Sequence, residues 1–164
     1  MDQIDIRLAQ IEGAGAINDI YNHYVLTSTC TFHLEPVSTQ ERLEWLAGHN
    51  DRYPVIVAVC KGQIVGWASL SPFRPRPAYA GTVESSVYVH HLHQRKGIGR
   101  LLMLDLISRA KALGYHSIIA GAEATQYGSI RLHEELGFEH VAQFKQVGFK
   151  FDTWLDTVFL QLML

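Results

Sequence analysis

The sequence predicts a mixed α+β fold in which a central, mostly antiparallel sheet of about seven strands carries helices on both faces. Short apolar or alternating segments, typical of strands, are interleaved with segments of helical periodicity in the order β-α-α-β-β-β-α-β-α-β-β. The strand–helix–strand segment between Thr82 and Ala122 predicts a right-handed parallel crossover, and the segments on either side predict antiparallel pairs. No repeat, low-complexity segment or linker interrupts the 164 residues, so we expect one domain over residues 1–164.

The first third of the chain predicts one strand and two helices. Apolar and charged residues alternate over Ile4–Leu8, as in a half-buried strand. Apolar residues recur at helical spacing over Glu12–Leu26, and Thr27–Pro36 is a connection rich in β-branched and turn residues. Ser38–Glu41 has the spacing of a capping box, so a short second helix is expected to begin there and to end near Gly48.

The middle of the chain predicts a β-meander. Pro54–Cys60 is a nearly continuous apolar strand, Lys61-Gly62 makes a tight turn, and Ile64–Leu70 is the returning strand. The loop Ser71–Tyr79 holds three of the five prolines, and it is expected to be stiff because proline fixes φ and has no amide donor. Thr82–Val89 is the next strand.

The rest of the chain predicts two helices and three strands. The helices are expected over Ile98–Leu113 and Ser129–Leu136, and the strands over His116–Ala122, Val141–Val147 and Trp154–Leu164. A glycine follows each helix, Gly114 and Gly137, as is typical of a helix that ends in the left-handed conformation.

Composition argues against several classes of partner. The net charge is −2, whereas nucleic-acid and polybasic membrane partners require an excess of Lys and Arg. No apolar run approaches the length of a membrane span, and the N-terminus lacks the pattern of a signal peptide, so we expect a cytoplasmic protein. Cys30 and Cys60 lie far apart in apolar contexts, which favours two free thiols over a disulfide.

A candidate phosphate site lies in Val87–Leu101, which reads VYVHHLHQRKGIGRL. An apolar strand end runs into a basic loop with two glycines before a helix, and the free amides of a helix start bind anions. A dinucleotide fingerprint needs a third glycine where Leu102 stands, and a P-loop needs Gly-Lys-Ser/Thr where the chain has Gly99-Arg100-Leu101. What remains is Gln94-x-x-Gly97-x-Gly99, which by itself also suits a plain glycine turn before a helix.

Between the fourth strand and the third helix, this motif resembles the acetyl-CoA pyrophosphate loop of the GNAT superfamily of acetyltransferases, and the order of elements is similar to that fold. The resemblance implies acetyl-CoA as the acetyl donor. It implies that the pyrophosphate is bound by the backbone amides of Arg95, Lys96, Gly97, Ile98, Gly99 and Arg100, and that the pantetheine arm pairs with the backbone of Val87, Tyr88 and Val89.

A more specific resemblance is spread from residue 20 to residue 156. The segments that carry it are Ile20-Tyr21-Asn22, Tyr53-Pro54, Ala78-Tyr79, Thr82–Val89, Leu132–Phe138, Val147–Lys150 and Trp154-x-Asp156. They are similar to the phosphinothricin and methionine sulfoximine N-acetyltransferases. This resemblance implies acetylation of the free amino group of a small amino-acid-like substrate by direct attack, in a protein that pairs as a homodimer.

Glu84 is the first candidate catalytic residue. It lies in an otherwise apolar or hydroxylic strand, TVESSVYV, where partial desolvation raises the pKa and the basicity of a carboxylate. Strand alternation places it on one face with Thr82, Ser86 and Tyr88. By resemblance it is the glutamate that takes the proton from the ammonium, directly or through water. The oxyanion is expected to be stabilised by a backbone amide of the Tyr88–Val89 region.

His133 is the second candidate. In the wider superfamily a tyrosine often occupies this place and acts as general acid to the departing thiolate, and here the residue is histidine, as in the phosphinothricin subfamily. A histidine that titrates near neutrality is able to give a proton to the thiolate or to take one from the amine, and the sequence leaves both roles open.

The substrate side of the site is predicted from charge and resemblance. Arg74 and Arg76 precede the catalytic strand and offer two guanidinium groups for a carboxylate and for a phosphinate or sulfoximine oxygen. Tyr79 and Thr82 are expected in the same pocket, and Lys150 and Trp154 in a pocket shared across a dimer interface. Gln126 stands where the family commonly has an asparagine that contacts the CoA arm, so the amide is kept but shifted by one methylene.

Three other interpretations remain open. The first is a metal-dependent interaction protein, suggested by the cluster of His90, His91 and His93. The stretch lacks Cys, Asp or Glu to complete a ligand set, so no metal is expected. A non-catalytic acyl-CoA sensor is a second alternative, against which the presence of both Glu84 and His133 argues. The third is an N-acetyltransferase for another amine or for a protein N-terminus.

Overall fold

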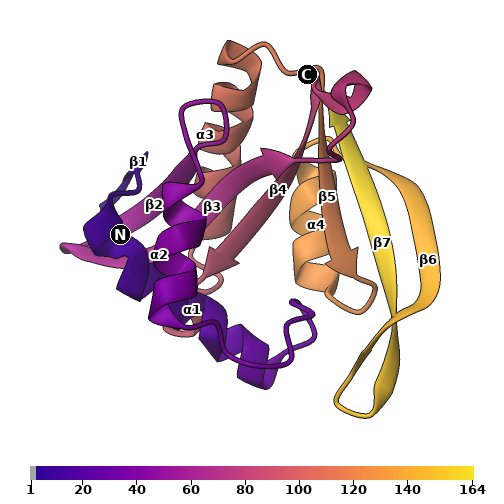
Figure 1. The fold of residues 1–164 in the computed structure, drawn as a ribbon, viewed down its shortest axis with the longest axis horizontal. Helices are drawn as coiled ribbons and strands as arrows, with labels where there is room; N and C mark the ends of the chain where they lie inside the picture. The colour runs from indigo at the N-terminus through magenta and orange to yellow at the C-terminus, as the bar shows by residue number, and fades with distance from the viewer. Residues whose placement is uncertain (1–2) are drawn as a thin grey trace.

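The computed structural model describes residues 3–164 as one twisted sheet with helices on both of its faces (Figure 1). The helices are α1 (Ala14–Thr27), α2 (Thr39–Ala47), α3 (Ile98–Ala112) and α4 (Tyr127–Glu135), and the strands are β1 (Ile4–Leu8), β2 (Val55–Cys60), β3 (Gln63–Pro72), β4 (Thr82–Val89), β5 (Ser117–Glu123), β6 (Glu139–Lys150) and β7 (Thr153–Met163). Short 3₁₀ turns lie at Ile11–Gly13, Pro77–Tyr79 and His91–His93.

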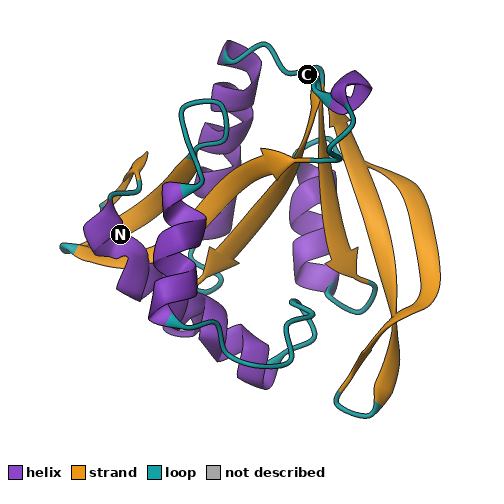
Figure 2. Cartoon of the chain, viewed as in Figure 1, coloured by secondary structure: helices purple, strands orange, loops and turns teal. Residues whose placement is uncertain are grey.

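The sheet has the strand order β1-β2-β3-β4-β5-β7-β6. Its pairs are antiparallel except for β4 and β5, which run parallel on either side of the α3 crossover. Helices α1 and α2 cover one face and α3 and α4 the other (Figures 1 and 2). The predicted fold class, the order of elements and the parallel pair are therefore confirmed.

Two hydrophobic clusters hold the layers together. On the α1 side, Ile17 and Tyr21 pack with Trp67 and Val57. On the α3 side, Leu102 and its neighbours pack with β2, β4 and Phe138. Strand β2 supplies apolar side chains to both faces, which explains its continuous apolar sequence, and each fully buried aliphatic side chain contributes about 1.5–3 kcal/mol.

The structure confirms the predicted start of α2 and the predicted ends of α3 and α4 at glycines. Ser38 accepts a hydrogen bond from the Glu41 amide while the Glu41 carboxylate accepts one from the Ser38 amide, which is the predicted capping box of α2. Gly114 and Gly137 have φ of 79° and 91° after α3 and α4, in the left-handed region where glycine is free of strain. Both cysteines are free thiols, as predicted.

The prediction was wrong at the ends of three strands. Strand β3 continues to Pro72, so the proline-rich loop begins after Pro72 and not at Ser71. Strands β6 and β7 form a longer hairpin than predicted, closed by Phe151 and Asp152 with φ of 51° and 54°. Such a turn usually carries Asn or Gly, so its residues gave no signal, and register shifts along β6 obscure the alternation.

No helix within residues 3–164 is long and apolar enough to cross a membrane.

Candidate active site

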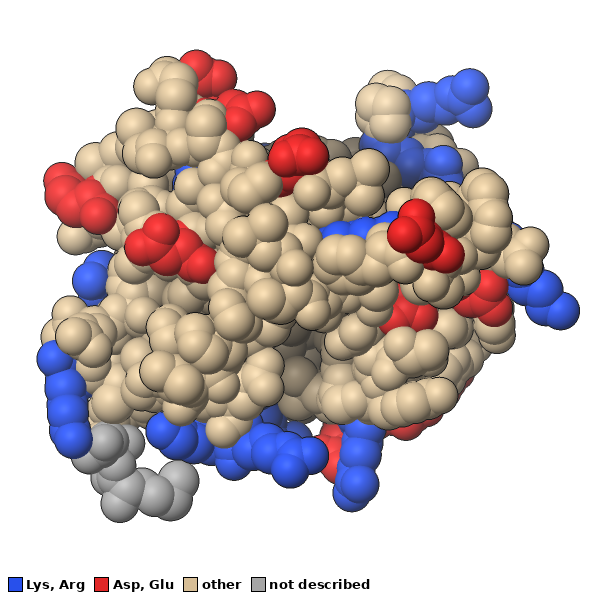
Figure 3. Space-filling model, turned by 90° about the horizontal axis from the view of Figure 1, so that it is seen from below, with Lys and Arg blue, Asp and Glu red and all other residues tan. Residues whose placement is uncertain are grey.

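The candidate site is a cavity of about 1160 Å³ at the point where β4 and β5 separate. The two strands pair from Thr82 with Ser117 to Ser85 with Ala120, and beyond this point β4 pairs with β3 alone and β5 with β7 alone. Figure 1 shows the two strands diverging beyond this point. Seen from below, this end of the molecule is hollowed, and Lys and Arg side chains gather along one of its edges (Figure 3).

One end of the cavity is formed by the loop before α3. No side chain caps the N-terminus of α3, so the amides of its first turn are available to a ligand. Gly97 has φ of 79° and Arg95 has φ of 60°, with Lys96 between them outside the left-handed region, and such alternation turns successive amides into an anion-binding concavity. Gly99 lies against Val89 and Leu132, where a larger side chain would narrow the entrance.

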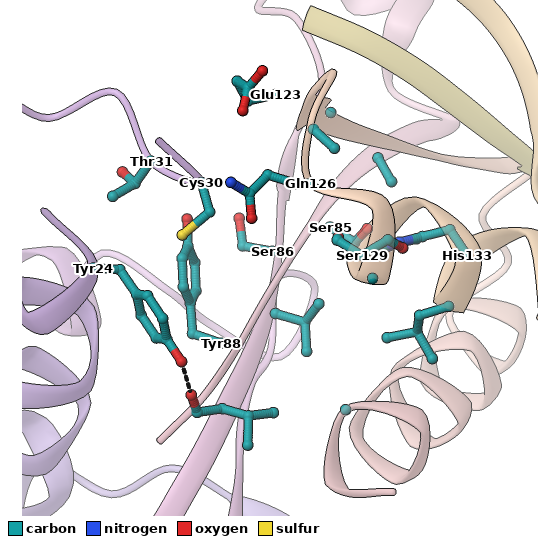
Figure 4. Close-up of a pocket in the computed structure, with 18 of the residues that line it drawn as sticks. Tyr24, Cys30, Thr31, Ser85, Ser86, Tyr88, Glu123, Gln126, Ser129 and His133 are labelled. Atoms are coloured by element: carbon teal, nitrogen blue, oxygen red, sulfur yellow. Dashed lines mark hydrogen bonds between the residues drawn. The ribbon is translucent and has the colours of Figure 1, made fainter. Parts of the chain in front are cut away.

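Most of the residues predicted to bind the donor line this cavity. They are Val87, Tyr88, Val89, Arg95, Gly97, Ile98, Gly99, Arg100 and Gln126. The side chain of Lys96 instead donates to the Leu92 carbonyl at 3.3 Å. Tyr24 donates to the Val89 carbonyl and accepts from the Gln94 amide, which ties the loop to α1 (Figure 4).

The backbone of β4 offers free donors to the gap. The His90 amide donates to the Val65 carbonyl of β3 at 2.9 Å. Because amides alternate in direction along a strand, those of Tyr88 and Ser86 also point to β3, and those of Val89 and Val87 point into the gap. Within the region where an oxyanion donor is expected, the Val89 amide therefore points into the gap and the Tyr88 amide points to β3.

Glu84 faces the cavity from β4 on the same side as Ser86 and Tyr88. Its Oε1 lies 3.8 Å from the place where a Cβ at Gly121 would stand, so the absence of a side chain at Gly121 leaves room beside the carboxylate. Burial raises the pKa of Glu84, and the nearby Arg74 charge partly opposes this. A carboxylate of raised pKa beside a cavity is a candidate general base.

His133 is buried under the cavity, on the α4 side of the sheet. Its Nδ1 lies 2.7 Å from the Ser129 carbonyl oxygen and its ring packs edge-on against Phe138. A carbonyl only accepts, so Nδ1 carries the hydrogen and Nε2 of the neutral ring is an acceptor. Burial lowers the pKa of His133, which also favours the neutral form.

The other side of the cavity is covered by the loop that follows α1, here called the 28–33 loop (residues 28–33). Thr29 donates to the Glu123 carboxylate at 2.7 Å, and Glu123 also accepts from the amide and hydroxyl of Thr125. Burial acts to raise the pKa of Glu123, but these hydrogen bonds outweigh it and the pKa is lowered. Glu123 is a further residue of the site that is not among the predicted ones, although a charged residue at the end of a buried strand is a signal.

Strand β6 holds the same loop from the far side. Lys150, only 3% exposed, donates from Nζ to the Thr31 carbonyl at 2.8 Å. The Phe32 ring lies on Gly148 so closely that a Cβ there would stand 2.4 Å from it. Cys30, Thr31 and Phe32 therefore form a fixed wall of the cavity opposite Glu84.

The four residues predicted to bind the acceptor do not line the cavity: they are Arg74, Arg76, Tyr79 and Thr82. The Arg74 guanidinium lies over the rings of Phe73 and Tyr79, at 4.9 and 6.0 Å from their centroids. The Thr82 hydroxyl pairs with Ser117. Arg74 alone of the four is linked to the site, through its effect on the pKa of Glu84. Trp154 is exposed on the β6–β7 hairpin.

The histidines before the phosphate loop stack on one another. The His91 ring lies 3.9 Å from that of His23 and 4.5 Å from that of His90, centroid to centroid. Nowhere in residues 3–164 are three or more His, Cys, Asp or Glu side chains arranged to hold a metal ion. The metal interpretation therefore finds no support in the placement of these rings.

Comparison with known proteins gives a consistent result. A family model described as the acetyltransferase (GNAT) family matches residues 17–138. An L-methionine sulfoximine/L-methionine sulfone acetyltransferase of Salmonella typhimurium is 44% identical over 97% of this chain and 94% of its own length.

Solved structures agree with these matches. A phosphinothricin acetyltransferase from Sinorhizobium meliloti, in complex with acetyl-CoA, has a TM-score of 0.94 and 37% identity over 98% of this chain and 88% of its own. A ribosomal-protein-alanine N-acetyltransferase from Brucella melitensis has a TM-score of 0.95 and 41% identity over 98% of this chain and 99% of its own.

Proposed function

Because this chain belongs to the GNAT family of acetyltransferases, we propose that it transfers the acetyl group of acetyl-CoA to the free amino group of a small amino-acid-like substrate. The observation that carries the proposal is one cavity that joins an uncapped helix N-terminus to a desolvated carboxylate, Glu84. The acceptor class, of the methionine sulfoximine, methionine sulfone and phosphinothricin type, is supported by the names of relatives that match nearly the whole chain.

The residues present suit the donor. The amides of Gly97, Ile98, Gly99 and Arg100 would hold the pyrophosphate, with the guanidinium groups of Arg95 and Arg100 nearby. The free amide of Val89 and the free carbonyl of Val87 would pair with the amide-bearing arm as an added strand does. Gln126 faces the same gap from the start of α4. When bound, acetyl-CoA supplies the acetyl group as an activated thioester.

Glu84 takes the role of base. It accepts a proton from the acceptor ammonium, directly or through a water, and leaves a free amine that attacks the acetyl carbon. The C–N bond forms as the C–S bond breaks, and the free backbone amide of Val87, nearer to Glu84 than that of Val89, stabilises the carbonyl oxygen as it gains charge. In the acceptor half the charged lining residues Glu84 and Glu123 are both acidic, which favours a cationic group there.

His133 has a narrower role than the sequence allowed. Its hydrogen is committed to the Ser129 carbonyl and burial disfavours its charged form, so the neutral ring has no proton to give from Nε2. We therefore assign it as an acceptor rather than as the acid for the thiolate. Among the residues predicted to bind the acceptor, we propose that Arg74 attracts the carboxylate of the acceptor. Its charge lies near enough to Glu84 to oppose part of the rise in pKa that burial causes there.

A screen of acceptor amines tests this function. Thiol release from acetyl-CoA is measured with methionine sulfoximine, methionine sulfone, phosphinothricin, the common amino acids and an alanine-ending peptide. The proposal expects the amino-acid analogues to give the highest kcat/KM. A peptide N-terminus is the second candidate, favoured by the similarity to the Brucella enzyme. Preference for the peptide would support that candidate, and no release with any amine would support a sensor.

Lys150 tests the role of the 28–33 loop. Lys150→Met keeps the apolar stem but leaves the Thr31 carbonyl without its donor, which should lower the free energy of unfolding by about 1–3 kcal/mol. Because the loop forms the acceptor wall and reaches the donor side only through the hydrogen bond from Gln126 to Thr29, we expect the KM for the amine to rise more than the dissociation constant for acetyl-CoA. Lys145→Met, at an exposed position on the same strand, is the control. Equal changes for both ligands would contradict the assignment.

We also propose a homodimer that is formed through the β6–β7 hairpin. The hairpin exposes large apolar side chains that a soluble monomer rarely leaves uncovered: Phe144, Val147, Phe149, Phe151 and Trp154. Trp154→Ser should therefore shift the sedimentation coefficient from dimer to monomer. A wild-type monomer would refute this proposal. We propose further that the chain is one domain and that it acts in the cytoplasm. The continuous seven-stranded sheet supports the proposal of one domain.

A further inference from the structure

Ser85 has a buried hydroxyl without a partner. Among the residues that the structure describes, only the Ser85 Oγ and the Trp67 Nε1 are buried side-chain polar atoms that lack a hydrogen bond. Trp67 lies in the core on the α1 side, away from the cavity lining, whereas Ser85 is 8% exposed and lines the cavity. Buried polar groups in proteins are nearly always paired, so a ligand is the natural partner for this one.

The position of Ser85 is the closed end of the gap. It is the last residue of β4 that pairs with β5 before the strands separate. From Val89, which lies beside Gly99, the strand runs back four residues to Ser85, a distance of about 13 Å at the usual rise per residue. An arm that starts at the α3 amides and follows β4 therefore ends beside Ser85.

Ser85 and Glu84 point to opposite faces of the sheet. Val83 belongs to the cluster on the α3 side, and alternation places Ser85 on that face and Glu84 on the other. Figure 4 shows Ser85 on the side of α4, which carries Ser129 and His133, and Ser86 on the side of Tyr88. A thioester in the gap thus has the base on one side and an unpaired hydroxyl on the other.

We propose that the Ser85 hydroxyl donates a hydrogen bond to the sulfur of the donor as the C–S bond breaks. The inference rests on the proposed function and adds the group that meets the leaving thiolate. The amine proton goes to Glu84, the electron pair of the C–S bond goes to sulfur, and the thiolate takes a proton from water after release. His133 does not supply this donor, since its hydrogen is held by the Ser129 carbonyl.

Ser85→Ala tests the proposal without endangering the fold. Since the hydroxyl has no protein partner, its loss leaves no group unpaired and the melting temperature should not fall. We expect kcat to fall by about tenfold, as for one hydrogen bond to a charged group, with little change in the dissociation constant of acetyl-CoA. The matched control is Ser69→Ala, at a buried serine of β3 outside the cavity lining, which should keep its activity.

A second readout does not depend on turnover. The thiol of CoA bound to the protein is titrated by the ultraviolet absorbance of its thiolate. A donor at Ser85 stabilises the thiolate, so the bound thiol should titrate about one pH unit higher in Ser85→Ala than in the wild type. Identical titrations would overturn the inference even if kcat fell. Failure of the wild type to bind CoA or to turn over would instead refute the proposed function.

Discussion

Replacing Glu84 with glutamine should lower kcat/KM for the amine by about 10²–10⁴-fold, the usual contribution of a general base. The reason is that the amide cannot take the ammonium proton, while its shape still fits beside Gly121. Steady-state thiol release measures the loss. The dissociation constant of acetyl-CoA should not change, since the phosphate loop lies at the other end of the cavity.

The pH dependence of kcat/KM in the wild type and in Glu84→Gln tests whether Glu84 is the base. Burial raises its pKa, so the acid limb of kcat/KM should lie at higher pH than for an ordinary glutamate, and activity should fall as pH drops through that pKa. This limb should vanish in Glu84→Gln. A raised carboxyl pKa also means that ionisation costs stability above the unfolded pKa, so the variant should be no less stable at neutral pH. Glu139→Gln, at an exposed position outside the cavity, should behave as wild type; an acid limb that persists in Glu84→Gln would assign the base elsewhere.

Replacing Gly97 with alanine should weaken acetyl-CoA binding by about 5- to 30-fold. Gly97 has φ of 79°, and a Cβ in the left-handed region costs roughly 1–2 kcal/mol. The loop is exposed, so we expect the variant loop to adopt a relaxed conformation without ligand and to meet this cost when the ligand requires the original amide directions. Calorimetric titration with acetyl-CoA measures the change.

Gly114 provides a control with the same backbone geometry. It also has φ of 79°, and, as at Gly97, no atom lies within 4 Å of its would-be Cβ, but it follows the far end of α3. Gly114→Ala should therefore lose about 1–2 kcal/mol of stability and keep its affinity for acetyl-CoA. Equal loss of affinity in the two variants would show that the effect at Gly97 is general destabilisation and not the loss of a phosphate site.

The fold was predictable because its signals are local. The capping box at Ser38, the glycines after α3 and α4, and the apolar run of β2 each specify a short segment, and their order specifies the sheet. The ends of β6 and β7 beside their connecting turn were not predictable, because Phe151 and Asp152 adopt a turn that their residue types do not favour.

The candidate site was predictable only in part. The loop before α3 and the desolvation of Glu84 follow from neighbouring residues. The acceptor wall depends on Thr29 with Glu123 and on Lys150 with Thr31, which are 94 and 119 residues apart in sequence. No local pattern contains such pairs. The free hydroxyl of Ser85 likewise depends on where β4 leaves β5, which appears only in the sheet register.

The fate of an isotope-labelled acetyl group tests the central claim most directly. The purified protein is mixed with acetyl-CoA that is labelled in its acetyl group and with methionine sulfone, and the products are separated and identified by mass. The account predicts that the label appears on the amino nitrogen of methionine sulfone in amounts equal to the CoA released, and that Glu84→Gln slows this transfer. Label recovered only as free acetate, or left on acetyl-CoA while the amine is unchanged, would contradict it.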